Sequence, residues 1–262
     1  MKKRAIISLI ALVTLLVALL AFIFLNDQTS IQKFTSHPSL TPTNQATSEK
    51  ISETQSTSQS QISPQDLPSA RPSDWELVLV NRTSTKPELN PSLASVGSIQ
   101  VDQRIANQVT EFLAAAQKIS PAEHLISGYR SVAYQSELYE GYIQDEMAGH
   151  GTVNVDGKPI SRQEAIKNVQ TYSQPPGSSE HQTGLAIDMS DIDSLNASQV
   201  APQIAAIAPN YGFILRFPAG KQAETGVDYE DWHFRYVGIE NAKYMTEHKL
   251  TLEEYLKLLP NK

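Results

Sequence analysis

The sequence predicts one α+β domain with a largely antiparallel sheet flanked by helices, preceded by an apolar segment and a polar linker. Composition changes twice along the 262 residues, near positions 26 and 73, and leaves 189 residues, 74–262, that can build a core. A stretch of this length suits a single domain. Its helix and strand patterns mix without the regular alternation of a parallel sheet, which favours the α+β class.

Residues 1–26 are predicted to be a transmembrane signal-anchor. Three basic residues precede an uncharged run of 21 residues from Ala5 to Leu25. At about 1.5 Å per helical residue this run matches the ~30 Å hydrocarbon core of a bilayer. The basic flank should stay in the cytoplasm, which places the rest of the chain outside the cell membrane. The alternative is a cleaved signal peptide, whose charged start looks the same and which would leave a secreted protein.

Residues 27–73 are predicted to be a disordered linker. Of these 47 residues, 30 are Ser, Thr, Gln or Pro and only six are Ile, Leu or Phe. Such a segment buries too little apolar surface to offset the entropy lost on ordering.

Charge and cysteine content exclude several classes of protein. Residues 74–262 carry 15 basic and 24 acidic residues, a net charge of −9, so nucleic acid is not an expected partner. Cysteine is absent, which rules out a disulfide scaffold, a thiolate zinc finger and a catalytic cysteine. No internal repeat is visible, and we expect a monomer.

The first half of the domain reads as short strands and amphipathic helices. Apolar residues recur at helical spacing within 101–118 and along one side of 132–147. The segments 75–80 and 124–127 are predicted to be strands, and the second of them ends at a glycine. The predicted elements are, in order, strand Trp75–Val80, helix Val101–Lys118, strand His124–Ser127 and helix Val132–Met147.

The second half begins with a predicted loop over 149–159. Ser161 then starts a helix with Glu164 at the capping-box position. Two prolines and a glycine at 175–177 break the chain before the next strand. The remaining predicted elements are strand Leu185–Met189, helix Ser198–Ala208, strands Gly212–Phe217 and Trp232–Val237, and helices Ile239–Thr246 and Thr251–Leu259.

The first chemical motif is Ser-Glu-His-Gln-Thr-Gly-Leu-Ala-Ile-Asp at 179–188. In strand geometry Gly184, Ala186 and Asp188 share one face, and the apolar residues between them face the core. We expect the two small residues to leave room beside the carboxylate. His181 precedes the strand, and a histidine nitrogen with a carboxylate oxygen suits a cation such as zinc. Taken singly, the two residues also fit a surface histidine and a turn-capping aspartate.

The second motif is Tyr-Glu-Asp-Trp-His-Phe-Arg-Tyr at 229–236. His233 opens a predicted strand, and Glu230 lies three residues earlier in the preceding loop. A third ligand here would give two histidines and one carboxylate with a fourth position open, which is the ligand set of a catalytic zinc. A nearby carboxylate can then serve as general base. The E-x-x-H spacing alone equally fits a surface ion pair.

The third motif is Ser-Gly-Tyr-Arg-Ser at 127–131, where a strand passes into a helix. Arg130 can project over a pocket and hold a carboxylate or a developing oxyanion. A solvated arginine at a helix start is the alternative.

The three motifs occur in this order and together resemble the VanY-type zinc D-alanyl-D-alanine carboxypeptidases, including their L,D-carboxypeptidase (LdcB-like) branch. The resemblance covers residues 75–237. It implies a Hedgehog/DD-peptidase-like fold and one catalytic Zn²⁺ bound by His181, Asp188 and His233.

The same resemblance implies roles for four further residues. Glu230 would be the general base, and Arg130 would stabilise the carbonyl oxygen in the transition state. Gln135 and Ser179 match positions that contact the substrate's D-Ala. Asp231 departs from the family pattern, because many members have proline there, and it should change the stiffness of this loop.

The expected function is removal of the C-terminal D-Ala from peptidoglycan stem peptides by a domain that faces the cell wall. The sequence leaves open whether the bond is D,D in a pentapeptide or L,D in a tetrapeptide. Two alternatives are a wall-binding module without turnover, which would not need Glu230, and an endopeptidase or amidase on the same zinc site.

Residues 141–178 lie between the motifs and are predicted to form a lid or pocket wall that selects the stem peptide.

Overall fold

The computed structural model describes residues 67–192 and 196–260. The predicted anchor, 1–26, and the predicted linker up to residue 66 lie outside the described residues. Within the described ranges, no helix combines the length and the apolar character needed to cross a bilayer.

The centre of the domain is a four-stranded sheet in the order β3-β4-β6-β5, with every neighbouring pair antiparallel. This confirms the α+β class with an antiparallel sheet. The four strands predicted from residue 124 onward are present, and three are shorter or shifted by one or two residues at their ends. They are β3 (His124–Ser127), β4 (Ala186–Ser190), β5 (Phe213–Leu215) and β6 (His233–Tyr236).

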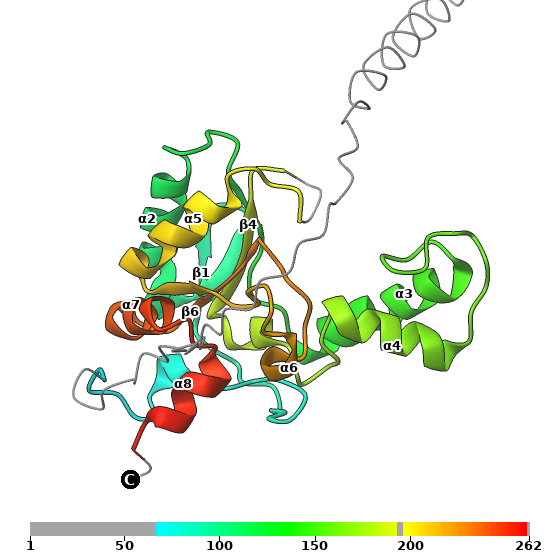
Figure 1. Cartoon of the computed structure of the whole chain (residues 1–262), viewed down its shortest axis with the longest axis horizontal. Coiled ribbons are helices and arrows are strands. Elements are labelled where there is room, and N and C mark those ends of the chain that lie inside the picture. The colour runs from blue at the N-terminus through cyan, green and yellow to red at the C-terminus, as the bar shows by residue number, and fades with distance from the viewer. Residues whose placement is uncertain (1–66, 193–195, 261–262) are drawn as a thin grey trace, which may run out of the picture. The chain divides into compact units, whose positions relative to one another are not determined.

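The main hydrophobic core lies between this sheet and two helices, α2 (Ala106–Ala116) and α5 (Ala201–Ile207). Figure 1 shows both helices on one side of β4. Phe112 of α2 stacks on Phe213 at 5.2 Å and meets Phe234 edge-on at 5.1 Å between ring centroids. The alternating apolar residues of the strands therefore face α2, as the sequence predicts for Leu185 and Ile187.

The helix predicted over 101–118 begins later than expected. Residues 93–102 instead form a hairpin of β1 (Leu93–Val96) and β2 (Ile99–Asp102), which turns at Gly97 with φ +55°. Val101 pairs with Ala94 in that hairpin. The helical apolar spacing continues to Val101 because this residue, although it is in a strand, belongs to the same buried core as the helix.

The strand predicted over Trp75–Val80 is wrong. Residues Trp75–Leu77 form a short 3-10 helix, and the rest of the segment is irregular. The carbonyl oxygens of Glu76 and Val78 accept hydrogen bonds from Arg235 Nη2 at 3.0 and 2.8 Å. A buried guanidinium thus satisfies backbone groups that a neighbouring strand would otherwise pair.

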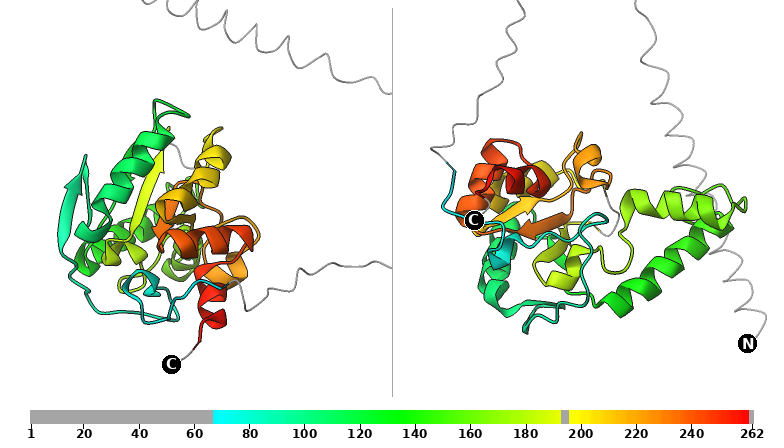
Figure 2. Two further views of the ribbon diagram at one scale, coloured as in Figure 1. Left: turned by 90° about the vertical axis from the view of Figure 1, so that its left-hand side faces the viewer. Right: turned by 90° about the horizontal axis from the view of Figure 1, so that it is seen from below.

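Two helices form an arm that extends away from the sheet in Figure 1 and in the right-hand view of Figure 2. They are α3 (Val132–Ala148) and α4 (Arg162–Tyr172), both close to prediction, and Ser161 caps α4 by accepting from Glu164 N at 3.2 Å. The arm has its own small core, made of Tyr139, Ile143, Ala165 and Val169.

The C-terminal helices α7 (Ile239–Glu247) and α8 (Leu252–Leu258) pack on a third cluster. Leu67 and Ala70 belong to this cluster, although the sequence assigns them to the linker. The folded unit therefore starts by residue 67 rather than 74, because two isolated apolar residues in a polar stretch find a partner surface. A further short helix, α6 (Gln222–Thr225), was not predicted.

Glu123, just before β3, provides a test of how buried acids affect stability. Burial raises the pKa of this carboxyl, with help from the charge of Asp191, to about 7. Because the folded pKa lies above the unfolded one, the group's stabilising contribution is complete below about pH 4.5 and is lost as pH rises through about 7. We expect Glu123→Gln to increase the free energy of unfolding by about 1–3 kcal/mol at about pH 8.5 and to change it little at about pH 4.5. Urea unfolding measures this, with exposed Glu111→Gln as control, and an equal effect at both pH values would contradict it.

Candidate active site

The register of the central sheet brings the three sequence motifs together. Asp188 of β4 pairs with Ser127 of β3 on one side and with His233 of β6 on the other. Three motifs that are far apart in the chain therefore meet across three adjacent strands. Because Asp188 and His233 are register partners on neighbouring strands, a carboxylate and a histidine lie side by side.

His181 reaches the same place from a 3-10 helix, Glu180–Thr183, rather than from a strand. That helix ends at Gly184, whose φ of +68° favours glycine. A Cβ at Gly184 would lie 2.7 Å from Asp102 N. The expectation that Gly184 clears space beside Asp188 is therefore wrong, since the glycine serves the turn and its close contact with β2.

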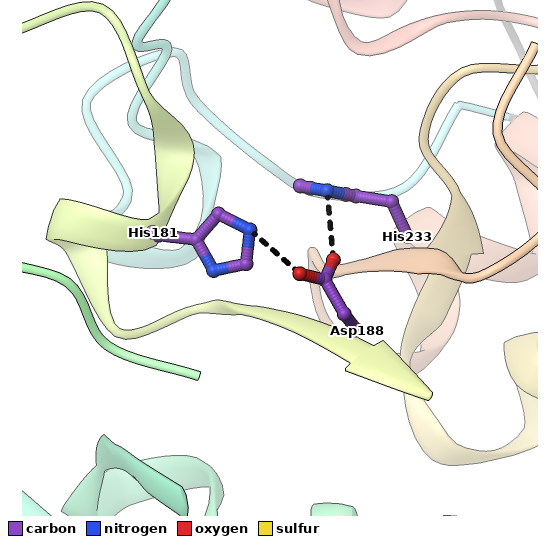
Figure 3. A group of neighbouring side chains, drawn as sticks. All are labelled: His181, Asp188 and His233. Carbon is purple, nitrogen blue, oxygen red and sulfur yellow. Dashed lines mark ion pairs between the residues drawn. The ribbon is translucent and has the colours of Figure 1, made fainter. Parts of the chain in front are cut away.

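The side chains of His181, Asp188 and His233 converge, as Figure 3 shows. His181 Nε2 lies 3.4 Å from Asp188 Oδ2, and His233 Nδ1 lies 3.2 Å from Asp188 Oδ1. One possible ligand atom from each of the three lies within 4.8 Å of the other two. The structure thus brings together all three residues predicted to bind metal.

The tautomer of His181 can be assigned from its surroundings. Its Nδ1 lies 2.6 Å from the carbonyl oxygen of Gly128, and because a carbonyl only accepts, Nδ1 must carry the proton. Burial, with the charge of Arg130, lowers the pKa of His181 to about 4, so the ring is neutral. The buried Nε2 then offers a lone pair toward Asp188 and has no hydrogen-bond partner in the described part of the chain.

Two electron-rich atoms facing each other at 3.4 Å are unfavourable unless a cation lies between them. Burial would raise the pKa of Asp188, but the two histidines outweigh it and hold the pKa well below its usual range. For His233, burial would lower the pKa, yet Asp188 and Glu180 raise it to about 9. The cluster therefore favours added positive charge, and its two nitrogens and one carboxylate suit zinc.

Glu230 lies beside this cluster. Its Oε2 is 3.6 Å from His233 Nδ1, and its backbone N–H donates to Phe217 O at 3.1 Å. Burial raises the pKa of Glu230 to about 8, since burial outweighs the opposing charges of His233 and Arg130. A buried carboxyl with a raised pKa next to a cation site is suited to taking up and releasing a proton.

The cluster opens into a pocket of about 580 Å³, within the size range of small-molecule sites. Arg130, Gln135 and Ser179 all line it, together with Asp188, Glu230 and His233, whereas His181 is buried and is not part of the lining. Arg130 Nε is buried with no hydrogen-bond partner among the described residues, which leaves it available to a bound group. Gln135 Nε2 already donates to Gln174 O at 2.7 Å, and its buried Oε1 has no partner within the described ranges.

Asp231, at the position where many family members have proline, makes a hydrogen bond through its backbone N–H. Its backbone N–H donates to Asn196 Oδ1 at 3.0 Å, and Asn196 Nδ2 donates to Tyr229 O at 2.7 Å. Proline has no N–H and cannot make the first of these bonds. The Asn196 amide thereby holds the backbone on both sides of Glu230. The expected change in loop stiffness stays a prediction.

Three buried charged residues near the site were not predicted, namely Glu180, Arg216 and Arg235. The sequence feature that indicates these buried charges is an arginine inside each of two apolar strand segments, Ile-Leu-Arg-Phe at 214–217 and His-Phe-Arg-Tyr at 233–236. A buried arginine needs a carboxylate partner, and Glu180 is that partner, with bonds of 2.9 and 2.8 Å.

An antiparallel α+β domain with two histidines, an aspartate and a buried glutamate at one pocket has the arrangement of a metallohydrolase. A family model described as VanY, D-alanyl-D-alanine carboxypeptidase, matches residues 98–239. The chain therefore belongs to the VanY family of D-alanyl-D-alanine carboxypeptidases.

Individual relatives agree with this assignment. A D-alanyl-D-alanine carboxypeptidase of Enterococcus faecalis is 32% identical over 70% of this chain and 66% of the relative, so the chain spans slightly less than two thirds of that protein. Among solved structures, a VanY D,D-pentapeptidase variant from the VanB-type resistance cassette, in complex with Zn(II), has a TM-score of 0.61 and 32% identity, covering 70% of this chain and 99% of that one. The LdcB LD-carboxypeptidase has a TM-score of 0.57 and 28% identity, covering 71% of this chain and 87% of that one.

Proposed function

We propose that the protein is a zinc-dependent carboxypeptidase that removes the C-terminal D-Ala from peptidoglycan stem peptides. The observation that supports this most is the meeting of His181, Asp188 and His233 with Glu230 in one pocket. Zn²⁺ in the related VanY structure, and the similarity to both D,D- and L,D-enzymes, support the metal and the class of substrate.

His181 Nε2, one Asp188 oxygen and His233 Nδ1 would hold the ion. When bound, Zn²⁺ supplies Lewis-acid polarisation of the scissile carbonyl and lowers the pKa of water. Glu230 accepts a proton from the attacking water and later donates it to the amine of the departing D-Ala. The Arg130 guanidinium stabilises the negative charge that develops on the carbonyl oxygen. The reaction thus adds one water molecule across the amide bond and releases free D-Ala and the shortened peptide.

The direct test uses the purified full chain with tetrapeptide and pentapeptide substrates, with and without a chelator. We expect chelator-sensitive release of free D-Ala, restored by added zinc. Release that is insensitive to chelator would contradict the mechanism. Tight peptide binding without any product would favour a wall-binding module, and cleavage inside the stem or at its sugar link would favour an endopeptidase or amidase.

We also propose that the helical arm selects between tetrapeptide and pentapeptide. Eight pocket-lining residues come from the 141–178 segment, namely Tyr142, Thr152, Val153, Thr171, Tyr172, Ser173, Gln174 and Ser178. The loop after α3 is fixed by Glu146, whose buried carboxylate accepts from Val153 N and Asn154 N, both at 2.8 Å. This carboxylate therefore sets the position of one pocket wall.

Glu146→Gln tests the role of that wall. The amide offers one acceptor oxygen instead of two, so the loop loosens while the metal residues stay in place. We expect the tetrapeptide-to-pentapeptide rate ratio to change by more than about threefold, with zinc stoichiometry unchanged. The matched control is Glu140→Gln, an exposed residue of the same helix that pairs with Arg162. A ratio that stays within about twofold of the unaltered protein, or equal changes in both variants, would refute the prediction.

We propose further that residues 1–26 anchor the protein in the cell membrane and that the domain faces the wall. The support is the uncharged run over residues 5–25 behind three basic residues. Protease added to intact, wall-stripped cells should degrade the membrane-associated domain. Protection of the domain would contradict this location, and recovery of the whole protein in the medium would favour the cleaved form.

A further inference from the structure

Next to the metal site lies a cluster of buried charges that the proposed reaction does not use. We call it the charge cluster, and it consists of Glu180, Arg216, Arg235 and Glu253, all of them buried. Glu180 Oε1 accepts from Arg216 Nε at 2.9 Å and from Arg235 Nη1 at 2.8 Å. Buried ion pairs rarely stabilise a fold more than apolar packing would, because each charge must be desolvated. A role other than stability is therefore the better explanation of this cluster.

The second oxygen of Glu180 points to that role. Glu180 Oε2 lies 3.8 Å from His233 Nε2, within ion-pair distance, and has no hydrogen-bond partner among the residues that the structure describes. A carboxylate at this position favours a proton on Nε2 and leaves the lone pair of His233 on Nδ1, the atom nearest Asp188. Carboxylates that orient metal-binding histidines in this way strengthen metal binding.

The C-terminal helix α8 supports Glu180 through Arg216. Glu253 of α8 accepts two bonds from Arg216, at 2.6 and 3.0 Å, and a third from Asn81 Nδ2 at 3.0 Å. Helix α8 lies beyond residue 239, where the family match ends. An element outside the matched region thus fixes the guanidinium that holds Glu180.

We propose that Glu180 is a positioning residue that holds His233 with its Nδ1 lone pair toward the metal, and that Glu253 on α8 completes this support. The proposal rests on the proposed zinc site. It predicts that metal affinity depends on α8, although no residue of that helix lines the pocket.

The test measures zinc affinity of the purified full chain by competition with a chelator, and the visible absorption of the Co²⁺-substituted protein. In Glu180→Gln the amide N–H groups facing His233 favour the wrong tautomer, so we expect zinc affinity about 10–100-fold weaker and an altered Co²⁺ spectrum. Glu253→Gln should weaken zinc binding by about 3–10-fold.

Glu254→Gln is the matched control on the same helix. Glu254 completes the capping box of α8 and pairs with Lys221 at 2.7 Å, so its loss destabilises the helix without touching the charge cluster. We expect its zinc affinity to stay within about twofold of the unaltered protein. Thermal unfolding of the metal-free proteins shows which variants fold. If Glu180→Gln does not fold, the zinc affinity of Glu253→Gln tests the proposal.

Equal zinc affinities of the Glu253 and Glu254 variants would overturn the proposal. So would a folded Glu180→Gln protein that binds zinc within about threefold of the unaltered chain. An unaltered chain that does not bind zinc would refute the proposed function itself, and the inference with it.

Discussion

Glu230→Gln is expected to lower kcat by about 10²–10⁴-fold while the protein still binds one zinc ion. The side chain is buried beside His233, 3.6 Å from its Nδ1. Gln has the same shape but cannot take the proton of the attacking water. Because burial disfavours the charged form of Glu230, the neutral amide should not destabilise the fold.

Steady-state D-Ala release and zinc analysis of the same samples measure these two properties. Glu224→Gln is a suitable control, since this exposed glutamate lies six residues earlier on α6 and does not line the pocket. Activity of Glu230→Gln within about tenfold of the unaltered protein would exclude Glu230 as the base. Loss of zinc together with activity would instead assign it a role in holding the metal.

Arg130→Gln is expected to reduce kcat/KM by about 10²–10³-fold, the usual effect of removing one group that stabilises an oxyanion. The backbone of Arg130 is tied to the site, because its N–H donates to His181 O at 3.2 Å. Its side chain lines the pocket with a buried, unpartnered Nε among the described residues. Loss of the guanidinium should therefore affect catalysis without loosening the loop.

Arg130→Lys separates charge from geometry. Lysine keeps the positive charge but lacks the planar fork, so we expect it to recover only part of the lost rate. Zinc stoichiometry should stay at one in both variants, and Arg162→Gln on the arm, an exposed ion-pair residue, should change the rate little. An Arg130→Gln enzyme that retains about a third or more of the activity would rule out this role.

Elements with strong local patterns could be predicted from the sequence. The helices α3 and α4, the antiparallel strands and the cap at Ser161 follow from apolar spacing and capping chemistry, both of which are local. The irregular segment after Trp75 could not, because its backbone partner is distant in the chain. Hydrogen bonds from Arg235 to the carbonyls of Glu76 and Val78 decide this case. The hairpin over 93–102 pairs locally, but the helical apolar spacing runs on to Val101, which belongs to the same core, and this hides the hairpin.

Some residues of the candidate site could also be predicted from the sequence, and others could not. Motif spacing and family resemblance identified His181, Asp188, His233, Glu230 and Arg130, and the structure brings the first four of them together and places Arg130 on the same pocket. The two arginines inside apolar strand segments indicate that buried carboxylates must pair with them, but only the fold identifies these as Glu180 and Glu253, because the two arginines and Glu253 lie 36 to 73 positions from Glu180 along the chain. Residue types and their order carry the chemistry, because a ligand or base must be of a given kind. Sheet register and packing decide which nitrogen carries a proton, since that depends on neighbours brought together only by folding.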